Sequence, residues 1–164
     1  MIPFVLFGAP VAWKRPFHKL IGGRVIIFDS QKKEKEQARW QMRSHFNSNH
    51  LITCPVDVEM TFCFKVPSST SKARKREMLV GMAKHMTKPD VDNLQKFYLD
   101  CLTGCVLLDD CLVFSIRATK LYSEDECVRI YIRPHHPLPE IIEKMDLLEF
   151  ADGDDEGEDK DEDD

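Results

Sequence analysis

The sequence predicts an α+β fold, a single small domain in which helices flank a mixed β-sheet. Segments with a hydrophobic period of two and segments with a period near 3.6 follow one another in the order ββαβααββ(α). The 164 residues are 43% hydrophobic, which is enough for one core. No apolar run approaches the roughly 18 residues that a membrane-spanning helix needs. We therefore expect one soluble domain.

Two strands and a basic loop are expected at the N-terminus. Residues 3–8 are apolar and end in a Gly-Ala-Pro turn signal. Gly22-Gly23 opens a second strand over residues 24–28. Between these strands, Trp13–Pro16 forms a loop that contains two adjacent bases.

A charged helix and a long strand follow. Ser30 is the expected N-cap of a helix that runs to about Phe46 and has only a narrow apolar stripe, which places it on the surface. Pro55–Val66 carries the clearest strand pattern, because apolar and polar residues alternate over its last eleven positions. This period of two predicts a strand with one buried face.

Two helices and a hairpin complete the predicted domain. Lys72–Lys84 is basic and expected to be helical. The next helix should begin near Asp92 as N-cap and stop at Gly104, because its apolar residues recur at i, i+3, i+4, i+7 and i+8. Residues 112–122 and 126–133 are β-rich and separated by a short polar turn, which predicts a hairpin.

The charge of the chain is divided between a basic body and an acidic tail. Residues 146–164 hold 12 acids against one base, whereas residues 1–145 hold 22 bases against 16 acids. Such asymmetry is typical of proteins that handle nucleic acids. We expect a folded domain over residues 1–137, a short helix within 138–150, and a disordered acidic tail over 151–164.

The six cysteines contain no Cys-x-x-Cys motif, and nothing in the sequence indicates an oxidising compartment. A zinc site from Cys101, Cys105 and Cys111 fits known ligand spacings poorly. We interpret the cysteines as reduced thiols, most of them buried.

Acidic residues gather in two short segments that are candidates for chemistry. Because Pro89 favours an extended chain before the helix, Asp90 and Asp92 can point to the same side. A second acidic pair, Asp109-Asp110, stands just before a strand. Clustered carboxylates repel one another unless a cation neutralises them, and their hard oxygens suit Mg²⁺ or Mn²⁺. Such a metal can generate hydroxide to attack a phosphodiester, while the Lys96 ammonium offsets charge on the phosphate.

A purely structural interpretation of the same residues stays open on spacing alone. Asp92 can serve only as an N-cap, and Asp92, Lys96 and Asp100 can form a surface charge ladder along the helix. The pair Asp109-Asp110 can be an ordinary turn.

The order of these residues resembles the signature of RusA-like Holliday-junction resolvases, which are small dimeric endonucleases known chiefly from phages and prophages. The resemblance spans about residues 3–133 and rests on five segments: Gly8–Pro16, Lys88–Lys96, Leu99-Asp100, Leu102–Gly104 and Asp109-Asp110. It implies metal-binding catalytic aspartates at Asp90, Asp92 and Asp110, an active-site lysine at Lys96, and secondary roles for Asn93 and Asp109.

The resemblance implies a Mg²⁺-dependent crossover junction endodeoxyribonuclease, with Mn²⁺ as an alternative metal. It would act as a homodimer that resolves four-way DNA junctions by paired symmetric nicks during recombination, repair and replication. We expect contacts to the DNA backbone from a set of exposed bases: Lys14, Arg15, Lys72, Arg74, Lys75 and Arg76.

Two other functions remain open from the sequence. One is a nuclease for other branched DNA, such as flaps and forks, and the other is a non-catalytic DNA-binding protein. We expect the protein in the cytoplasm where its DNA is replicated, with a phage or viral origin, no membrane association, and a protein partner as one role for the acidic tail.

Overall fold

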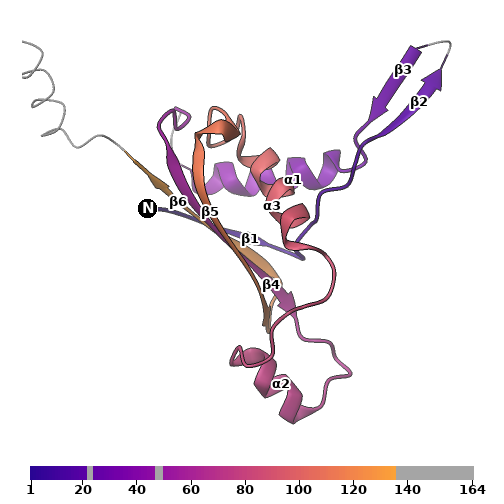
Figure 1. The fold of residues 1–164 in the computed structure, drawn as a ribbon, viewed down its shortest axis with the longest axis vertical. Helices are drawn as coiled ribbons and strands as arrows, with labels where there is room; N and C mark the ends of the chain where they lie inside the picture. Colours follow the sequence, from indigo (N-terminus) through magenta and orange to yellow (C-terminus); the bar gives the residue numbers. More distant parts are fainter. Residues whose placement is uncertain (22–23, 47–49, 136–164) are drawn as a thin grey trace, which may run out of the picture.

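A four-stranded mixed sheet forms the base of the molecule (Figure 1). The computed structural model describes residues 1–135 except 22–23 and 47–49. The strands lie in the spatial order β1 (Ile2–Phe7), β6 (Cys127–Pro134), β4 (Val56–Lys65) and β5 (Val113–Ser123). Strand β6 runs antiparallel to both β1 and β4, whereas β5 runs parallel to β4. The predicted α+β class with a mixed sheet is confirmed.

The helices take different places around this sheet. Helices α1 (Lys32–His45) and α3 (Val91–Leu102) cover one face, and α2 (Lys72–Leu79) lies apart from them beyond one end of the strands (Figure 1). A short 3₁₀ helix, η1 (Asp110–Leu112), leads into β5 and contacts α3. The expected C-terminal helix and the acidic tail lie outside the described residues. No helix in the described part of the chain is long and apolar enough to span a membrane.

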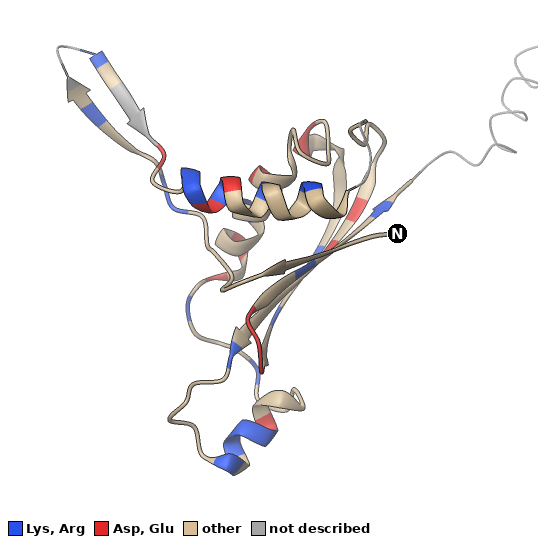
Figure 2. Cartoon of the chain, turned by 180° about the vertical axis from the view of Figure 1, so that it is seen from behind, with Lys and Arg blue, Asp and Glu red and all other residues tan. Residues whose placement is uncertain are grey.

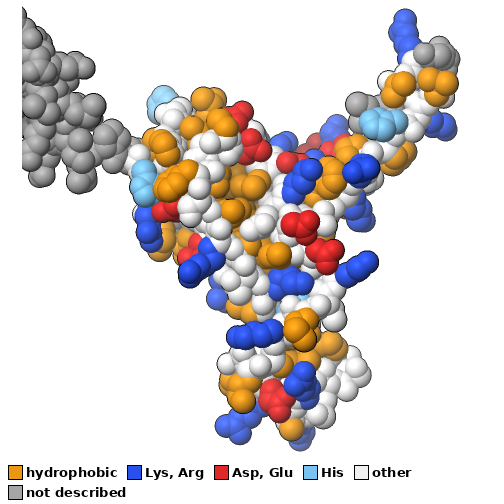
Figure 3. Space-filling view, viewed as in Figure 1, with side chains coloured by type: hydrophobic (Ala, Val, Ile, Leu, Met, Phe, Trp, Pro, Cys, Tyr) orange, Lys and Arg blue, Asp and Glu red, His pale blue; other side chains and the backbone are white. Residues whose placement is uncertain are grey.

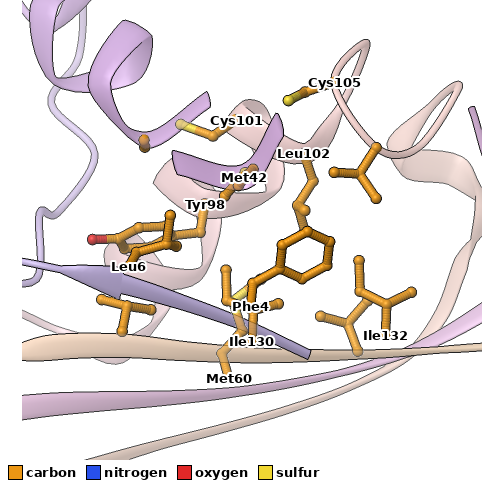
Figure 4. Close-up of a cluster of buried hydrophobic side chains, with 14 of the residues drawn as sticks. Phe4, Leu6, Met42, Met60, Tyr98, Cys101, Leu102, Cys105, Ile130 and Ile132 are labelled. Atoms are coloured by element: carbon orange, nitrogen blue, oxygen red, sulfur yellow. The ribbon is translucent and has the colours of Figure 1, made fainter. Parts of the chain in front are cut away.

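The core lies between the sheet and the two covering helices (Figure 4). The alternation predicted for residues 56–66 is confirmed, because Val56, Val58, Met60 and Phe62 are all buried. The apolar stripe predicted for α3 is fully buried as well: Leu94, Phe97, Tyr98, Cys101 and Leu102. These side chains pack against Phe4 and Leu6 of β1, Met42 of α1, and Ile130 and Ile132 of β6.

The predicted hairpin of the last two strands is wrong. Strands β5 and β6 are separated by β4, so the short connection of residues 124–126 passes across the end of β4 instead of joining two paired strands. At this crossing the Val66 amide donates a hydrogen bond of 3.2 Å to the Ser123 carbonyl. Strand β4, whose helix-facing residues Val56, Val58, Met60 and Phe62 are all apolar, takes an interior position of the sheet, where that face is fully buried.

One strand is added and three predicted boundaries change. Residues 17–21, for which no element was predicted, form β2 (Phe17–Ile21), which pairs antiparallel with β3 (Arg24–Phe28). Helix α1 is capped by Gln31 and not by Ser30, and α3 is capped by Asp90 and not by Asp92. Helix α2 ends at Leu79, five residues before its expected end, and Gly81 continues the chain at a φ of +77°.

A small aromatic cluster fixes the segment that leads into α3. His85 is buried, stacks on Phe64 with ring centroids 4.1 Å apart, and lies 4.8 Å from the Tyr122 ring. Its Nδ1 atom has no hydrogen-bond partner among the residues that the structure describes. Burial, followed by the nearby Lys120 charge, lowers the pKa of His85 below its ordinary value of 6.5.

We predict that His85 makes the fold sensitive to mild acid. The unfolded chain takes up a proton near pH 6.5, whereas the folded protein resists protonation until a lower pH. This contribution to stability is therefore complete above pH 6.5 and is lost as the pH falls through the folded-state pKa. Denaturant unfolding between pH 5 and 8 measures the effect.

The variant His85→Phe keeps the ring packing and removes the titrating group. Its free energy of unfolding should decline less between pH 7 and 5 than that of the wild type, whereas His18→Gln, at an exposed position, should retain the wild-type profile. An equal decline of the unfolding free energy in the wild type and in His85→Phe would contradict the proposed role of His85 in the pH dependence.

Candidate active site

Two of the predicted catalytic aspartates stand at the beginning of α3. Asp90 is the N-cap with an extended backbone, at φ −73° and ψ 147°, but its side chain makes no capping hydrogen bond. Asp92 lies in the first turn of the helix. Both carboxylates are exposed, and the described ion pairs and hydrogen bonds use neither of them. They are thus available to a ligand.

A lysine from the edge strand fixes the chain just before this pair. The Lys120 Nζ atom, on β5, donates hydrogen bonds to the carbonyl oxygens of Thr87 at 2.7 Å and Pro89 at 2.8 Å. The intervening Lys88–Pro89 peptide bond is cis. Sequence reasoning missed Lys120, because it is 30 residues from Asp90 and no local pattern connects the two.

Lys96 is held by an aromatic ring and not by a carboxylate. Its Nζ atom lies 3.8 Å from the centroid of the Trp13 ring. Among the described residues no ion pair joins Lys96 to Asp92 or Asp100, and Asp100 instead lies 3.4 Å from the Nζ atom of Lys35. The alternative of a charge ladder along α3 is therefore wrong.

The loop that carries Trp13 borders an open depression next to α3. The Trp13 amide donates a 2.8 Å hydrogen bond to the Asn93 carbonyl, which ties the loop to the helix. The depression has a volume of about 420 Å³ and is lined by Ala12, Trp13, Lys88, Pro89, Asp90 and Asn93. Figure 3 shows acidic side chains with basic ones beside them over the first turns of α3. A broad and charged opening suits a large anionic substrate better than a small apolar one.

A buried glutamine holds this loop from the opposite side. Gln31 is 1% exposed, and its Oε1 atom accepts a 2.6 Å hydrogen bond from the Lys14 amide. Its Nε2 atom donates a 2.9 Å bond to the Ala12 carbonyl. Both the oxygen and the nitrogen of the Gln31 amide thus have hydrogen-bond partners. This role could not be predicted from the sequence, because a polar residue at the start of a helix normally faces solvent.

Two further groups complete the support of the loop. The Tyr98 hydroxyl accepts a 3.1 Å hydrogen bond from the Val11 amide, and burial raises the pKa of Tyr98 to about 12. Asp29 accepts a 2.8 Å bond from the Gln31 amide, and this bond, with a second one from Lys35, lowers the pKa of Asp29. The loop is therefore anchored to both covering helices.

The second acidic pair has two different local roles. The Asp109 carboxylate accepts a 2.9 Å hydrogen bond from the Cys111 amide and caps η1, and this backbone bond lowers the pKa of Asp109. Asp110 begins η1 and is exposed. Helix η1 contacts α3 but stands at the start of β5, whereas Pro89 contacts Lys120 towards the other end of that strand, so the structure does not bring Asp110 together with Asp90 and Asp92.

The donor set fits a magnesium ion only in part. No three His, Cys, Asp or Glu side chains within the described ranges form a group able to hold a metal ion, so Asp110 does not complete a three-carboxylate site there. Mg²⁺ commonly uses one or two protein carboxylates together with water and substrate phosphate. Asp90 and Asp92, both exposed and without protein partners, meet that lower requirement. The role of all three as metal ligands stays a prediction.

The predicted DNA-contacting bases form two separate groups (Figure 2). Lys14 and Arg15 are exposed on the loop that leads into β2, and the other four are exposed on α2: Lys72, Arg74, Lys75 and Arg76. Arg74 lies 2.7 Å from the Glu77 carboxylate, which leaves it less available to phosphate than its neighbours. The cysteines are free thiols, and four of the six are buried, as expected.

The comparison with known proteins identifies the family. The sequence profile of the family described as endodeoxyribonuclease RusA matches residues 8–133. The chain belongs to the RusA endodeoxyribonuclease family. Among relatives, the uncharacterised protein YqaN of Bacillus subtilis (strain 168) is 33% identical over 135 residues, which cover 80% of this chain and 95% of the relative. The resemblance predicted from the aspartate motif is confirmed, and membership in the RusA family indicates an endonuclease that hydrolyses DNA phosphodiester bonds.

Replacing the buried glutamine should destabilise this RusA-family fold. In Gln31→Leu the Lys14 amide and the Ala12 carbonyl lose their partners inside the protein. Two part-buried backbone groups left without partners should cost about 1–3 kcal/mol of unfolding free energy. Urea denaturation measures the loss, and the exposed neighbour Gln37→Ala should stay within about 0.5 kcal/mol of the wild type. A loss below about 1 kcal/mol in Gln31→Leu would contradict the proposed clamp.

Removing the ring beneath Lys96 should free its ammonium without unfolding the protein. The contact of an exposed ammonium with an aromatic face is worth about 0.5–1 kcal/mol, so Trp13→Leu should release Lys96 while Trp13→Phe should retain it in part. The ring-current shift of the Lys96 ε-methylene protons in NMR spectra reports the contact directly. These protons should move towards random-coil values in Trp13→Leu, and an unchanged shift would contradict the contact.

Proposed function

We propose that the protein is a Mg²⁺-dependent endonuclease that resolves four-way DNA junctions, acting as a homodimer that makes paired symmetric nicks. The observation that carries this proposal is the pair of exposed, unpartnered carboxylates of Asp90 and Asp92 beside the depression bordered by Trp13. A pure DNA-binding protein has no use for free acids facing a phosphate backbone, because they repel it. A metal-dependent nuclease requires them.

The placement of charge around the site supports a long anionic substrate. Basic residues of the β2–β3 hairpin and its leading loop lie on one side of α3, and those of α2 lie on the other (Figures 1 and 2). A DNA backbone that contacts both groups passes over the first turn of α3. The amide groups at the start of a helix favour bound phosphate, so the helix itself adds to this attraction.

The residues of this chain divide the chemical work between them. A bound Mg²⁺ would polarise the phosphate and supply hydroxide for in-line attack, with Asp90 and Asp92 as its protein ligands. Lys96, held over Trp13, presents a positive charge to the phosphate as negative charge builds on it. Lys120 keeps the chain before Asp90 in place through the Thr87 and Pro89 carbonyls.

A homodimer suits the proposed substrate because a four-way junction has approximate two-fold symmetry. Two copies related by the same symmetry place one site on each of two strands of like polarity. Simultaneous nicks in those strands release two duplexes. Recognition then depends on shape and phosphate geometry more than on base sequence.

Neutralising one aspartate should abolish cleavage without abolishing DNA binding. With a labelled four-way junction and Mg²⁺, Asp90→Asn and Asp92→Asn should each cut at least about 100-fold more slowly, the scale of losing one electrostatic contact to the transition state. Binding should hold or tighten, because each change removes a charge that repels phosphate. Asp125→Asn, an exposed acid in the β5–β6 connection, should cut at the wild-type rate.

A substrate panel tests the junction preference in the same assay. Four-way junctions should be cut faster than flaps, forks and linear duplex, with nicks paired across the two strands. Equal cutting of flaps and forks would favour a broader branched-DNA nuclease. Tight junction binding without cleavage in either Mg²⁺ or Mn²⁺ would contradict the catalytic proposal.

A further inference from the structure

The β2–β3 hairpin, residues 17–21 and 24–28, forms an arm that projects from the body of the molecule (Figure 1). Its two strands pair with each other over five positions, from Phe17 opposite Phe28 to Ile21 opposite Arg24. Neither strand joins the main sheet. A two-stranded ribbon outside the main sheet is only marginally stable by itself, so its retention in the fold suggests a binding partner.

Two exposed apolar side chains near the end of the arm lie on the same face of the ribbon. Leu20 is 70% exposed and Val25 is 66% exposed, and these two residues are direct cross-strand partners. They therefore lie side by side on one face of the ribbon. Lys19 and Arg24 occupy the register positions of the opposite face and are exposed as well. Near its end, one face of the ribbon thus carries Leu20 and Val25, and the other carries the two bases, each at a register position opposite an isoleucine of the partner strand.

The charge of the arm indicates the chemistry of its partner. Residues 1–28 contain no acidic side chain, and all four of their bases lie in the arm or its leading loop: Lys14, Arg15, Lys19 and Arg24. The rest of the body also carries more bases than acids up to residue 145. The body of a second copy, residues 1–145, would therefore meet the arm with net charge of the same sign, whereas a nucleic acid backbone meets it with the opposite sign.

We propose that the arm binds in the major groove of a DNA duplex next to the cleavage site. The major groove, about 12 Å wide, admits a two-stranded ribbon, whereas the minor groove, about 6 Å wide, does not. In this arrangement Lys19 and Arg24 contact the phosphates that border the groove. Leu20 and Val25 face the base edges, where thymine methyl groups offer apolar surface. The inference rests on the proposed function only in taking duplex DNA as the substrate.

Chemical protection of guanine N7 tests the position of the arm, because N7 lies in the major groove. The probe is dimethyl sulfate on a four-way junction with guanine-containing arms, in EDTA so that no cleavage intervenes. Full-length wild-type protein should protect guanines in a duplex arm. A shortened variant, in which a two-residue Asn-Gly turn joins Phe17 directly to Phe28, should lose that protection. The same guanines reacting equally with both proteins would overturn the proposal.

Point variants separate the two faces of the arm. The double variant Lys19→Ala with Arg24→Ala should make log affinity depend less steeply on log salt. The magnitude of the slope should fall by about 2, because two phosphate contacts are lost. Leu20→Ser with Val25→Ser should keep the slope and reduce N7 protection. Arg117→Ala with Arg129→Ala removes the same charge from the sheet face opposite the helices and is the matched control, as is Met82→Ser for an exposed apolar side chain.

Sedimentation of the same variants tests the alternative partner. If Leu20→Ser with Val25→Ser, or the shortened variant, splits the wild-type assembly into smaller species, the arm is a contact between copies of the chain and the proposal is overturned. An unchanged sedimentation coefficient with lost N7 protection supports it. Junction cleavage distinguishes the two proposals, because arm-dependent protection without any nicking by the wild type would reject the nuclease proposal and leave the arm inference standing.

Discussion

One buried side chain, the amide of Gln31, joins the parts of the molecule on which the site depends. Its oxygen faces the amide of Lys14 and its nitrogen faces the carbonyl of Ala12, so the side chain must both accept and donate. A glutamate would lack the donor, and a leucine would lack both groups. Through this pair of bonds the start of α1 fixes the loop that leads from the sheet to the arm.

The same loop connects the core to the chemistry through α3. One side of α3 is a buried apolar stripe, and from that side the Tyr98 hydroxyl reaches the amide of Val11. The other side carries Asp92 and Lys96 towards solvent, where Trp13 lies over the lysine. Core packing and site geometry are thus coupled, because any shift of α3 in the core also moves the acids relative to the loop.

Much of this arrangement could be predicted from local pattern, and the remainder depends on distant residues. The strand at residues 56–65 and the stripe of α3 have strong periodicity, and both were predicted with the correct buried faces. The place of β4 between β5 and β6 was not predicted, because a three-residue connection normally indicates a hairpin. The order of strands in a sheet depends instead on which strand gains most from burial. Gln31 and Lys120 act across 17 and 31 residues, respectively, and leave no local signal.

The way Lys96 is held explains how acids and a base can share one site without neutralising each other. A salt bridge from Lys96 to Asp92 would fix both side chains, but it would use the carboxylate that a cation needs. The face of Trp13 attracts the ammonium through its quadrupole and uses no carboxylate oxygen. Asp90 and Asp92 therefore stay free of ion pairs, and no carboxylate shields the Lys96 ammonium among the described residues. In the function proposed above, both kinds of group are then available to a phosphate when DNA enters the depression lined by Trp13 and Asp90.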